Sequence, residues 1–82
     1  MNLYALAELH RAQGRYAQAE PLYRRSLAIL GKTLGPEHPQ VAQILENYAA
    51  LLRKTDREPE GAEMEARAKQ IRAKHAEQTP TK

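Results

Sequence analysis

The chain has 82 residues, of which 41% are hydrophobic and 28% charged, and it contains no cysteine, tryptophan or phenylalanine. This length permits one small domain, and the lack of cysteine excludes a disulfide framework, a thiolate zinc site and a cysteine nucleophile. The net charge of +3 is spread over both halves of the chain, and no apolar run approaches the roughly 18 residues of a membrane span. We therefore expect a cytoplasmic protein that does not enter a membrane.

Apolar residues that recur at helical spacing predict four helices, and no segment alternates with the two-residue period of a strand. The first two helices are expected near residues 2–13 and 17–33, separated by Gly14, which tolerates the positive φ of a tight turn. Pro21 falls inside the second helix, where we expect one lost backbone hydrogen bond and a slight bend. The predicted fold class is all-α.

The third helix is expected to begin at Pro39, because a first helical position does not need the N–H that proline lacks, and to end near residue 54. The fourth helix is expected near residues 59–76, after a polar stretch. Residues 77–82 offer no apolar anchor and are expected to form a disordered tail.

The four helices form an internal repeat. Shifting the chain by 42 positions superposes seven identical residues within 27 aligned positions, without a gap. The matched pairs begin with Leu3 and Leu45 and end with Ile29 and Ile71. Each unit is then one helical hairpin, and hairpins that cannot bury their apolar face alone stack on neighbours. The pattern therefore predicts two stacked antiparallel hairpins.

These hairpins carry several short segments that resemble a known repeat: LAEL at 6–9, QGRY at 13–16, AEPLY at 19–23, RSLAI at 25–29 and LGPEHPQVA at 34–42. The chain resembles the tetratricopeptide repeat, in the longer form found in kinesin light chains and many bacterial arrays. The resemblance implies a fragment of an α-solenoid in which residues 1–76 form a single domain, with repeat one at about 2–35 and repeat two at about 39–76. It implies an interaction module and not an enzyme, and no cofactor is expected.

The second repeat departs from the family pattern. Asp56 stands in place of the turn glycine, Gly61 in place of Ala19, and Glu65 in place of Tyr23. A fourth helix that is charged where a following repeat would touch it resembles a terminal cap, because the exposed end of a solenoid must be polar.

Two features that resemble chemical sites are better explained as structure. Gly31-Lys32-Thr33 resembles the end of a phosphate-binding loop, but it lacks the glycine five residues earlier and the preceding strand, so we expect a helix-end role. The three histidines, His10, His38 and His75, have no second ligand at helical spacing, so neither a metal site nor catalysis is expected.

The resemblance implies that the first helix of each hairpin lines a concave face that holds an extended or helical peptide. Helical spacing selects residues on these two helices that point away from the core positions. The candidate peptide-binding or partner-binding residues are Tyr4, Glu8, Arg11, Gln43, Glu46, Asn47, Arg53 and Lys54. Asn47 matches a position at which the family often has asparagine, whereas its equivalent in the first unit is Ala5. The alternative is that each of these residues is only solvated helix surface.

A second interpretation is a structural or self-assembling unit, either a homodimer or the end of a longer array. Repeat arrays generally need about three units to bury a continuous core, and two are present here. The uncovered side of the first hairpin is then expected to pair with a second copy. The candidate self-association residues are Leu3, Leu6, Leu30 and Leu34.

Nucleic-acid binding is not favoured. It would have to use arginines that are interspersed with acidic residues and offer no continuous track for phosphates. These arginines are Arg11, Arg15, Arg24 and Arg25. The expected partner is therefore a protein or a peptide.

Overall fold

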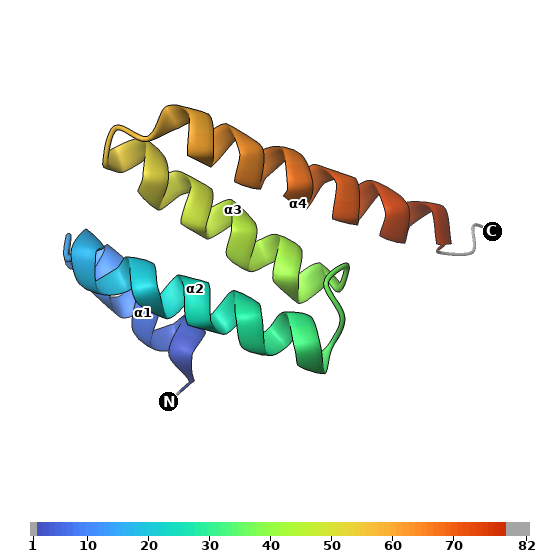
Figure 1. The fold of residues 1–82 in the computed structure, drawn as a ribbon, viewed down its shortest axis with the longest axis horizontal. Coiled ribbons are helices and arrows are strands. Elements are labelled where there is room, and N and C mark those ends of the chain that lie inside the picture. Colours follow the sequence, from blue (N-terminus) through green and yellow to red (C-terminus); the bar gives the residue numbers. More distant parts are fainter. Residues whose placement is uncertain (1, 79–82) are drawn as a thin grey trace.

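The computed structural model describes residues 2–78, and every regular element within them is an α-helix. The helices are α1 (Leu3–Ala12), α2 (Tyr16–Thr33), α3 (Pro39–Lys54) and α4 (Glu58–Gln78). Contacts join α1 to α2, α2 to α3 and α3 to α4, so two antiparallel hairpins lie side by side (Figure 1). The predicted all-α fold of four helices is confirmed.

The helix bounds lie within two residues of those predicted from the sequence. The largest difference is at α4, which continues to Gln78 and so includes the first two residues of the expected disordered tail. The rest of that tail, residues 79–82, lies outside the described residues.

Both hairpins turn through the same backbone motif. At the end of α1 the N–H of Arg15 donates to the carbonyl oxygen of His10 at 2.8 Å, and Gly14 between them has a φ of +78°. The equivalent hydrogen bond at the end of α3 is also 2.8 Å long, and Asp56 there has a φ of +63°. This combination is the Schellman motif, which satisfies carbonyl groups at a helix end. The prediction of a tight turn at Gly14 is confirmed.

Side chains cap the beginnings of α1 and α3. The side-chain oxygen of Asn2 accepts from the backbone N–H of Ala5 at 2.6 Å. The ring Nδ1 of His38 accepts the backbone N–H two residues further on at 3.1 Å, and Pro39 takes the first helical position as predicted. Pro21 lies inside α2, also as predicted. Local sequence signals therefore account for where these helices begin and for the one proline inside a helix.

Small residues lie where the two helices of each hairpin cross. Ala7 of α1 and Ala19 of α2 are fully buried, and their equivalents in the second hairpin are Ala49 and Gly61. A Cβ atom placed on Gly61 would lie 3.0 Å from the carbonyl oxygen of Ala49. The crossing of α3 and α4 is therefore close enough to exclude a larger side chain.

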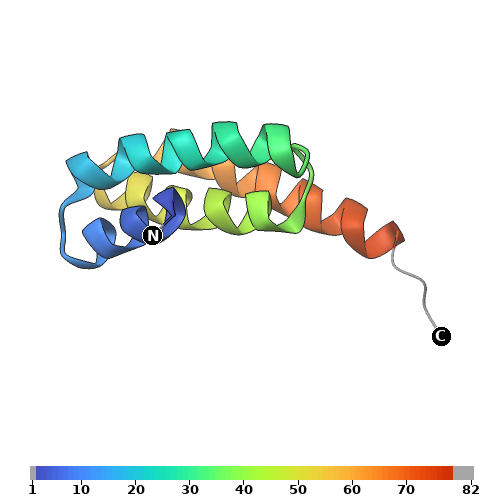
Figure 2. The ribbon, with the colours of Figure 1, turned by 90° about the horizontal axis from the view of Figure 1, so that it is seen from below.

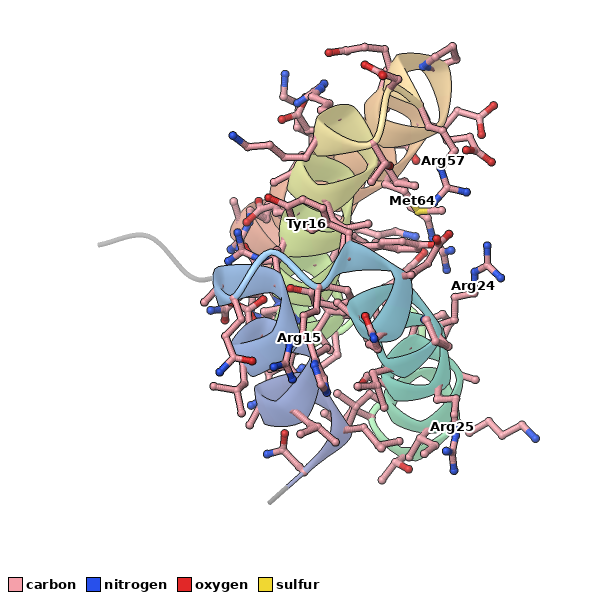
Figure 3. All side chains as sticks on the ribbon, turned by 90° about the vertical axis from the view of Figure 1, so that its left-hand side faces the viewer. Arg15, Tyr16, Arg24, Arg25, Arg57 and Met64 are labelled. Carbon is pink, nitrogen blue, oxygen red and sulfur yellow. The ribbon has the colours of Figure 1, made fainter. Side chains whose placement is uncertain are left out.

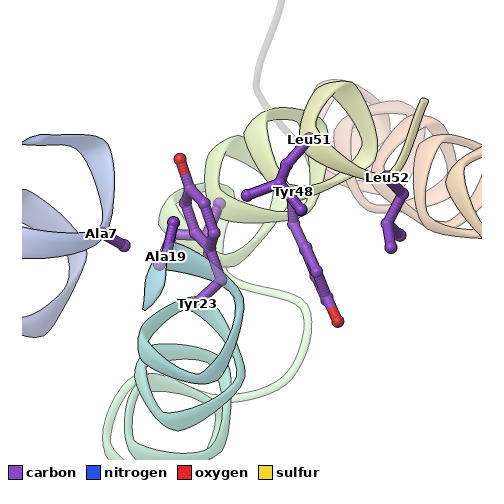
Figure 4. Packing of buried hydrophobic residues seen from close by; sticks show 7 residues of the cluster. Ala7, Ala19, Tyr23, Tyr48, Leu51 and Leu52 are labelled. Carbon is purple, nitrogen blue, oxygen red and sulfur yellow. The ribbon is translucent and has the colours of Figure 1, made fainter. Parts of the chain in front are cut away.

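One apolar cluster joins the two hairpins (Figure 4). Its centre is the ring of Tyr23 stacked on the ring of Tyr48, with centroids 5.7 Å apart and planes 17° apart. Leu51 and Leu52 of α3 are buried beside them. The buried members of this cluster are Ala7, Ala19, Tyr23, Ile44, Tyr48, Leu51 and Leu52, and Tyr4 and Tyr16 pack against it.

A second apolar cluster lies within the second hairpin. It consists of Val41, Ala42 and Leu45 of α3 with Ala68 and Ile71 of α4, all of them buried. These residues hold the beginning of α3 against the C-terminal half of α4.

Candidate functional site

The two first helices, α1 and α3, contact each other through Tyr4 and Asn47. The side-chain amide of Asn47 donates a hydrogen bond to the hydroxyl oxygen of Tyr4, and Gln43 lies close enough to this hydroxyl to lower its pKa. Burial raises the pKa of the Tyr4 hydroxyl, so the group is neutral at physiological pH. Three of the predicted binding residues therefore lie together at the junction of α1 and α3.

Glu8 and Arg11 form an ion pair that is also bound to Tyr23. Arg11 donates to a carboxylate oxygen of Glu8 and to the hydroxyl oxygen of Tyr23, each at 2.9 Å. The hydroxyl of Tyr23 donates to the other carboxylate oxygen of Glu8. The pKa of Tyr23 is raised, first by burial and then by this carboxylate. The side chains of Arg11 and Glu8 remain 33% and 30% exposed, so they still face solvent on α1.

Glu46 and Arg53 lie against α4 and are not brought together with Tyr4 and Asn47. Arg53 donates two hydrogen bonds to Glu65, at 2.9 and 2.7 Å, and a longer one of 3.2 Å to Glu58. Glu46 accepts two from Arg72, at 2.7 and 3.0 Å, and these hold the pKa of its carboxyl below the usual range. These ion pairs cover the outer face of the second hairpin.

Three further predicted residues lie away from this junction. Lys54 is exposed at the last position of α3. Leu34, 39% exposed, follows α2 and lines a shallow pocket with Pro39 and His75. Leu6 is half-buried on α1. None of the three shares a cavity with Tyr4 or Gln43 in the part of the chain that the structure describes.

An apolar cleft of about 420 Å³ opens at the beginning of α1, between the C-terminal half of α2 and the beginning of α3. Figure 2 shows that α1 extends along only part of α2. The lining residues are Asn2, Leu3, Tyr4, Ser26, Ile29, Leu30, Gln40, Gln43 and Ile44. Ile29 is 49% exposed there, and the buried hydroxyl of Ser26 has no hydrogen-bond partner among the described residues.

Of these lining residues, Leu3, Tyr4, Leu30 and Gln43 were predicted from the sequence as candidate binding or self-association residues, and the others were not. A usable signal was present, because the 42-residue repeat pairs the exposed Ile29 with the buried Ile71.

Glu20 forms a charged contact between the hairpins that the sequence analysis also missed. Its carboxylate accepts hydrogen bonds from Arg24 at 2.7 Å, from the hydroxyl of Tyr48 at 2.9 Å, and from Arg57. Burial raises the pKa of this carboxyl, but the bonds from Arg57 and Tyr48 outweigh burial and hold the pKa below its usual value. Figure 3 shows Arg24 and Arg57 on the same side of the molecule. Arg24 also donates to the hydroxyl oxygen of Tyr48 at 3.0 Å, so both arginines form hydrogen bonds between the hairpins.

Within residues 2–78 no group of three His, Cys, Asp or Glu side chains is arranged to hold a metal ion. No helix in that range is both long and apolar enough to cross a membrane. Gly31, Lys32 and Thr33 form the last turn of α2, as their expected structural role requires.

A model of the family described as tetratricopeptide repeat matches residues 1–74, which include both hairpins. No curated protein matches the chain.

Proposed function

Because the chain belongs to the tetratricopeptide repeat family, we propose that it binds a peptide or protein segment through the face formed by α1 and α3. Repeats of this family generally mediate protein–protein interaction. The binding residues in this proposal are Tyr4, Glu8, Arg11, Gln43 and Asn47.

The contact between Tyr4 and Asn47 is the observation that best supports this proposal. It joins the two first helices and leaves both side chains partly exposed. A primary amide has two donor hydrogens and an acceptor oxygen, and Tyr4 takes only one donor. Asn47 can therefore still donate to, and accept from, the backbone of a bound peptide.

The charged pair on α1 adds a second kind of contact. Glu8 and Arg11 neutralise each other, so a partner need not carry a large net charge to approach α1. Both are about one-third exposed, which leaves each side chain able to exchange partners with a bound segment. The proposed ligand is therefore an uncharged or mixed-charge peptide segment that uses backbone hydrogen bonds.

Peptide selection tests the proposal. Peptides of about 12 residues, selected from a random displayed library against the full chain, should bind the wild type and lose about tenfold in affinity to Asn47→Ala. The matched control is Gln18→Ala, which removes an exposed amide from α2. Peptides whose affinity is unchanged by Asn47→Ala, or is reduced as much by Gln18→Ala, would show that α1 and α3 do not form the binding face.

The second candidate function is a self-assembling unit or the terminal cap of a longer array. The ion pairs of Arg53 with Glu65 and of Glu46 with Arg72 favour a cap, because they place charge on the face where a further hairpin would stack. A homodimer would then use the first hairpin, where Ile29 is half exposed. Sedimentation equilibrium over a dilution series of the full chain separates a monomer from such a dimer.

A further inference from the structure

The hydroxyl of Tyr23 lies directly behind the ion pair on α1. Tyr23 is fully buried, whereas the side chains of Glu8 and Arg11 are partly exposed. The hydroxyl donates to one carboxylate oxygen of Glu8 and accepts from Nε of Arg11, while Nη2 of Arg11 donates to the other carboxylate oxygen. The three groups therefore close a ring of hydrogen bonds in which α2 supplies the buried member.

The second hairpin has a different arrangement at the same positions. The 42-residue repeat places Arg53 at the position of Arg11. It places Glu65, an acidic residue of α4, at the position of Tyr23. All three side-chain nitrogens of Arg53 donate hydrogen bonds, Nη1 and Nη2 to Glu65 and Nε to Glu58. A glutamate on the second helix therefore occupies both terminal nitrogens of the arginine that it faces.

Arg11 keeps one terminal nitrogen available, because the residue that faces it from α2 is a tyrosine. Its Nε and Nη2 are bound to Tyr23 and Glu8, but its Nη1 makes no hydrogen bond within residues 2–78. The buried polar side-chain atoms that lack a partner in this range belong to His10 and Ser26, so Nη1 of Arg11 is accessible to solvent. Arg11 can therefore donate to a ligand without giving up the bonds to Glu8 and Tyr23.

We propose that Tyr23 is a positioning residue of the peptide-binding face, which fixes Arg11 so that its Nη1 donates to a backbone carbonyl oxygen of the bound segment. Glu8 and Arg11 are neutral as a pair, and a carboxylate from the ligand would lie beside Glu8, so an uncharged acceptor fits better. The inference rests on the proposed function and deepens it, since it assigns a ligand group to Arg11 and a role to a buried residue behind the face.

The position of Arg11 along α1 sets the register of the ligand. Tyr4, which meets Asn47, and Arg11 are seven residues apart on α1, and this corresponds to roughly 10 Å along the helix. An extended segment covers that distance in about three residues. The carbonyl group that Arg11 binds should therefore lie about three residues from the peptide group that Asn47 binds.

The first test compares Tyr23→Phe with Tyr48→Phe. Each variant keeps its ring in the stack and removes one hydroxyl, and Figure 4 shows the two hydroxyls at opposite ends of the stack. Tyr23→Phe should lower the affinity for the library-selected peptides by about fivefold to tenfold, and Tyr48→Phe should leave it unchanged. Arg11→Lys keeps the charge but has a single donor nitrogen, so it should weaken binding as much as Tyr23→Phe.

A double-mutant cycle separates positioning from a general loss of stability. If Tyr23 acts through Arg11, Tyr23→Phe should not change the affinity of a chain that already carries Arg11→Ala. An effect of the lost hydroxyl on the fold alone would persist in that background.

The ring of hydrogen bonds can be tested without a peptide. In NMR spectra of the full isotope-labelled chain, the Nε–H of Arg11 should exchange slowly with water in the wild type and in Tyr48→Phe. It should exchange rapidly in Tyr23→Phe, which lacks the acceptor. Equal exchange in all three proteins would show that Tyr23 does not hold Arg11, and would overturn the inference.

A thioamide scan of one selected peptide tests the acceptor. Sulfur accepts hydrogen bonds more weakly than oxygen, so each carbonyl oxygen is replaced in turn. Replacement at the carbonyl that contacts Arg11 should weaken binding to the wild type and have no effect on binding to Arg11→Ala. A scan in which no position responds to Arg11→Ala in this way would exclude a backbone carbonyl as the ligand group.

Two affinity results would overturn the inference while the proposed function stands. One is that Tyr23→Phe binds as tightly as the wild type to peptides that Asn47→Ala weakens. The other is that the loss in Tyr23→Phe is just as large in the Arg11→Ala background. If Asn47→Ala also leaves the peptides unaffected, the proposed face is wrong and the inference is overturned with it.

Discussion

Asp56 adopts at the end of α3 the left-handed backbone conformation that Gly14 adopts at the end of α1, with φ values of +63° and +78°. A non-glycine residue in this region costs roughly 1–2 kcal/mol, and aspartate is among the side chains that tolerate it best. The turn of the second hairpin therefore has the same backbone geometry as that of the first, but its aspartate is strained where the first turn has an unstrained glycine.

Asp56→Gly should stabilise the chain by about 0.5–1 kcal/mol, because relief of the strained φ exceeds the extra entropy that glycine has in the unfolded state. Urea unfolding followed by far-UV circular dichroism measures the change. The reciprocal variant Gly14→Asp should destabilise by about 1 kcal/mol. A loss of stability in Asp56→Gly would mean that the aspartate side chain contributes more than its conformation costs.

Ala49→Leu should destabilise the chain by about 1–3 kcal/mol, because Ala49 is fully buried where α3 crosses α4. The space is already limited, since a Cβ on Gly61 would lie 3.0 Å from the Ala49 carbonyl oxygen. Ala50→Leu, at the next and exposed position, is the matched control and should change the free energy of unfolding by less than about 0.5 kcal/mol. If Ala49→Leu and Ala50→Leu destabilised the chain equally, Ala49 would not lie at the crossing of α3 and α4.

Glu20→Gln should make the chain less stable at neutral pH and less sensitive to acid. The folded-state pKa of this carboxyl lies below the ordinary value of 4.5, so the folded state binds fewer protons than the unfolded state. The stability that Glu20 contributes is therefore complete above about pH 4.5 and is lost as the pH falls further. We expect the free energy of unfolding of Glu20→Gln to be lower by roughly 1–3 kcal/mol at pH 7, since Arg57 and Tyr48 lose a charged partner.

The measurement for Glu20 is the urea midpoint between pH 3 and pH 7, with the exposed Glu63→Gln as control. The acid dependence should become shallower in Glu20→Gln without vanishing, because Glu46 and Glu65 also have lowered pKa values. If the urea midpoint of Glu20→Gln fell with pH as steeply as that of the wild type, protonation of Glu20 would not contribute to the loss of stability in acid.

The charged face of α4 should prevent stacking of a further hairpin. The combined variant Glu65→Tyr, Lys69→Leu and Arg72→Leu gives α4 the residue types that α2 has at the equivalent positions, which are Tyr23, Leu27 and Leu30. It should associate end to end in sedimentation experiments, because it exposes an apolar patch of the kind that α2 buries against α3. If this variant and the wild type had the same mass at all concentrations, the ion pairs would not act as a cap.

Local signals were sufficient to predict the fold of this chain. Gly14 and Pro39 mark the turn and the helix start through their own backbone chemistry, and the apolar period identifies each helix between such signals. The repeat then placed the two hairpins next to each other. For these reasons the helix bounds were predicted to within two residues.

The site was harder to predict, because the side of a helix that faces a neighbour depends on distant parts of the chain. Tyr4 and Asn47 were predicted on one face and do meet. Arg53 was predicted on the same face of α3 as Asn47. Its side chain instead lies against α4, where it hydrogen-bonds Glu65. Glu20 was missed because its partner Arg57 is 37 residues away, and no local pattern encodes such a contact.

The cluster that joins the hairpins also determines how the protein can be observed in solution. It contains or contacts all four tyrosines of a chain that has no tryptophan, so the near-ultraviolet absorption and the emission of the protein arise from this one region. Helix content is read at shorter wavelengths and arises from the whole molecule. If the hairpins separate while their helices persist, the tyrosine signal should change before the helical one, and the difference between the two signals measures the docking of the hairpins without an added label.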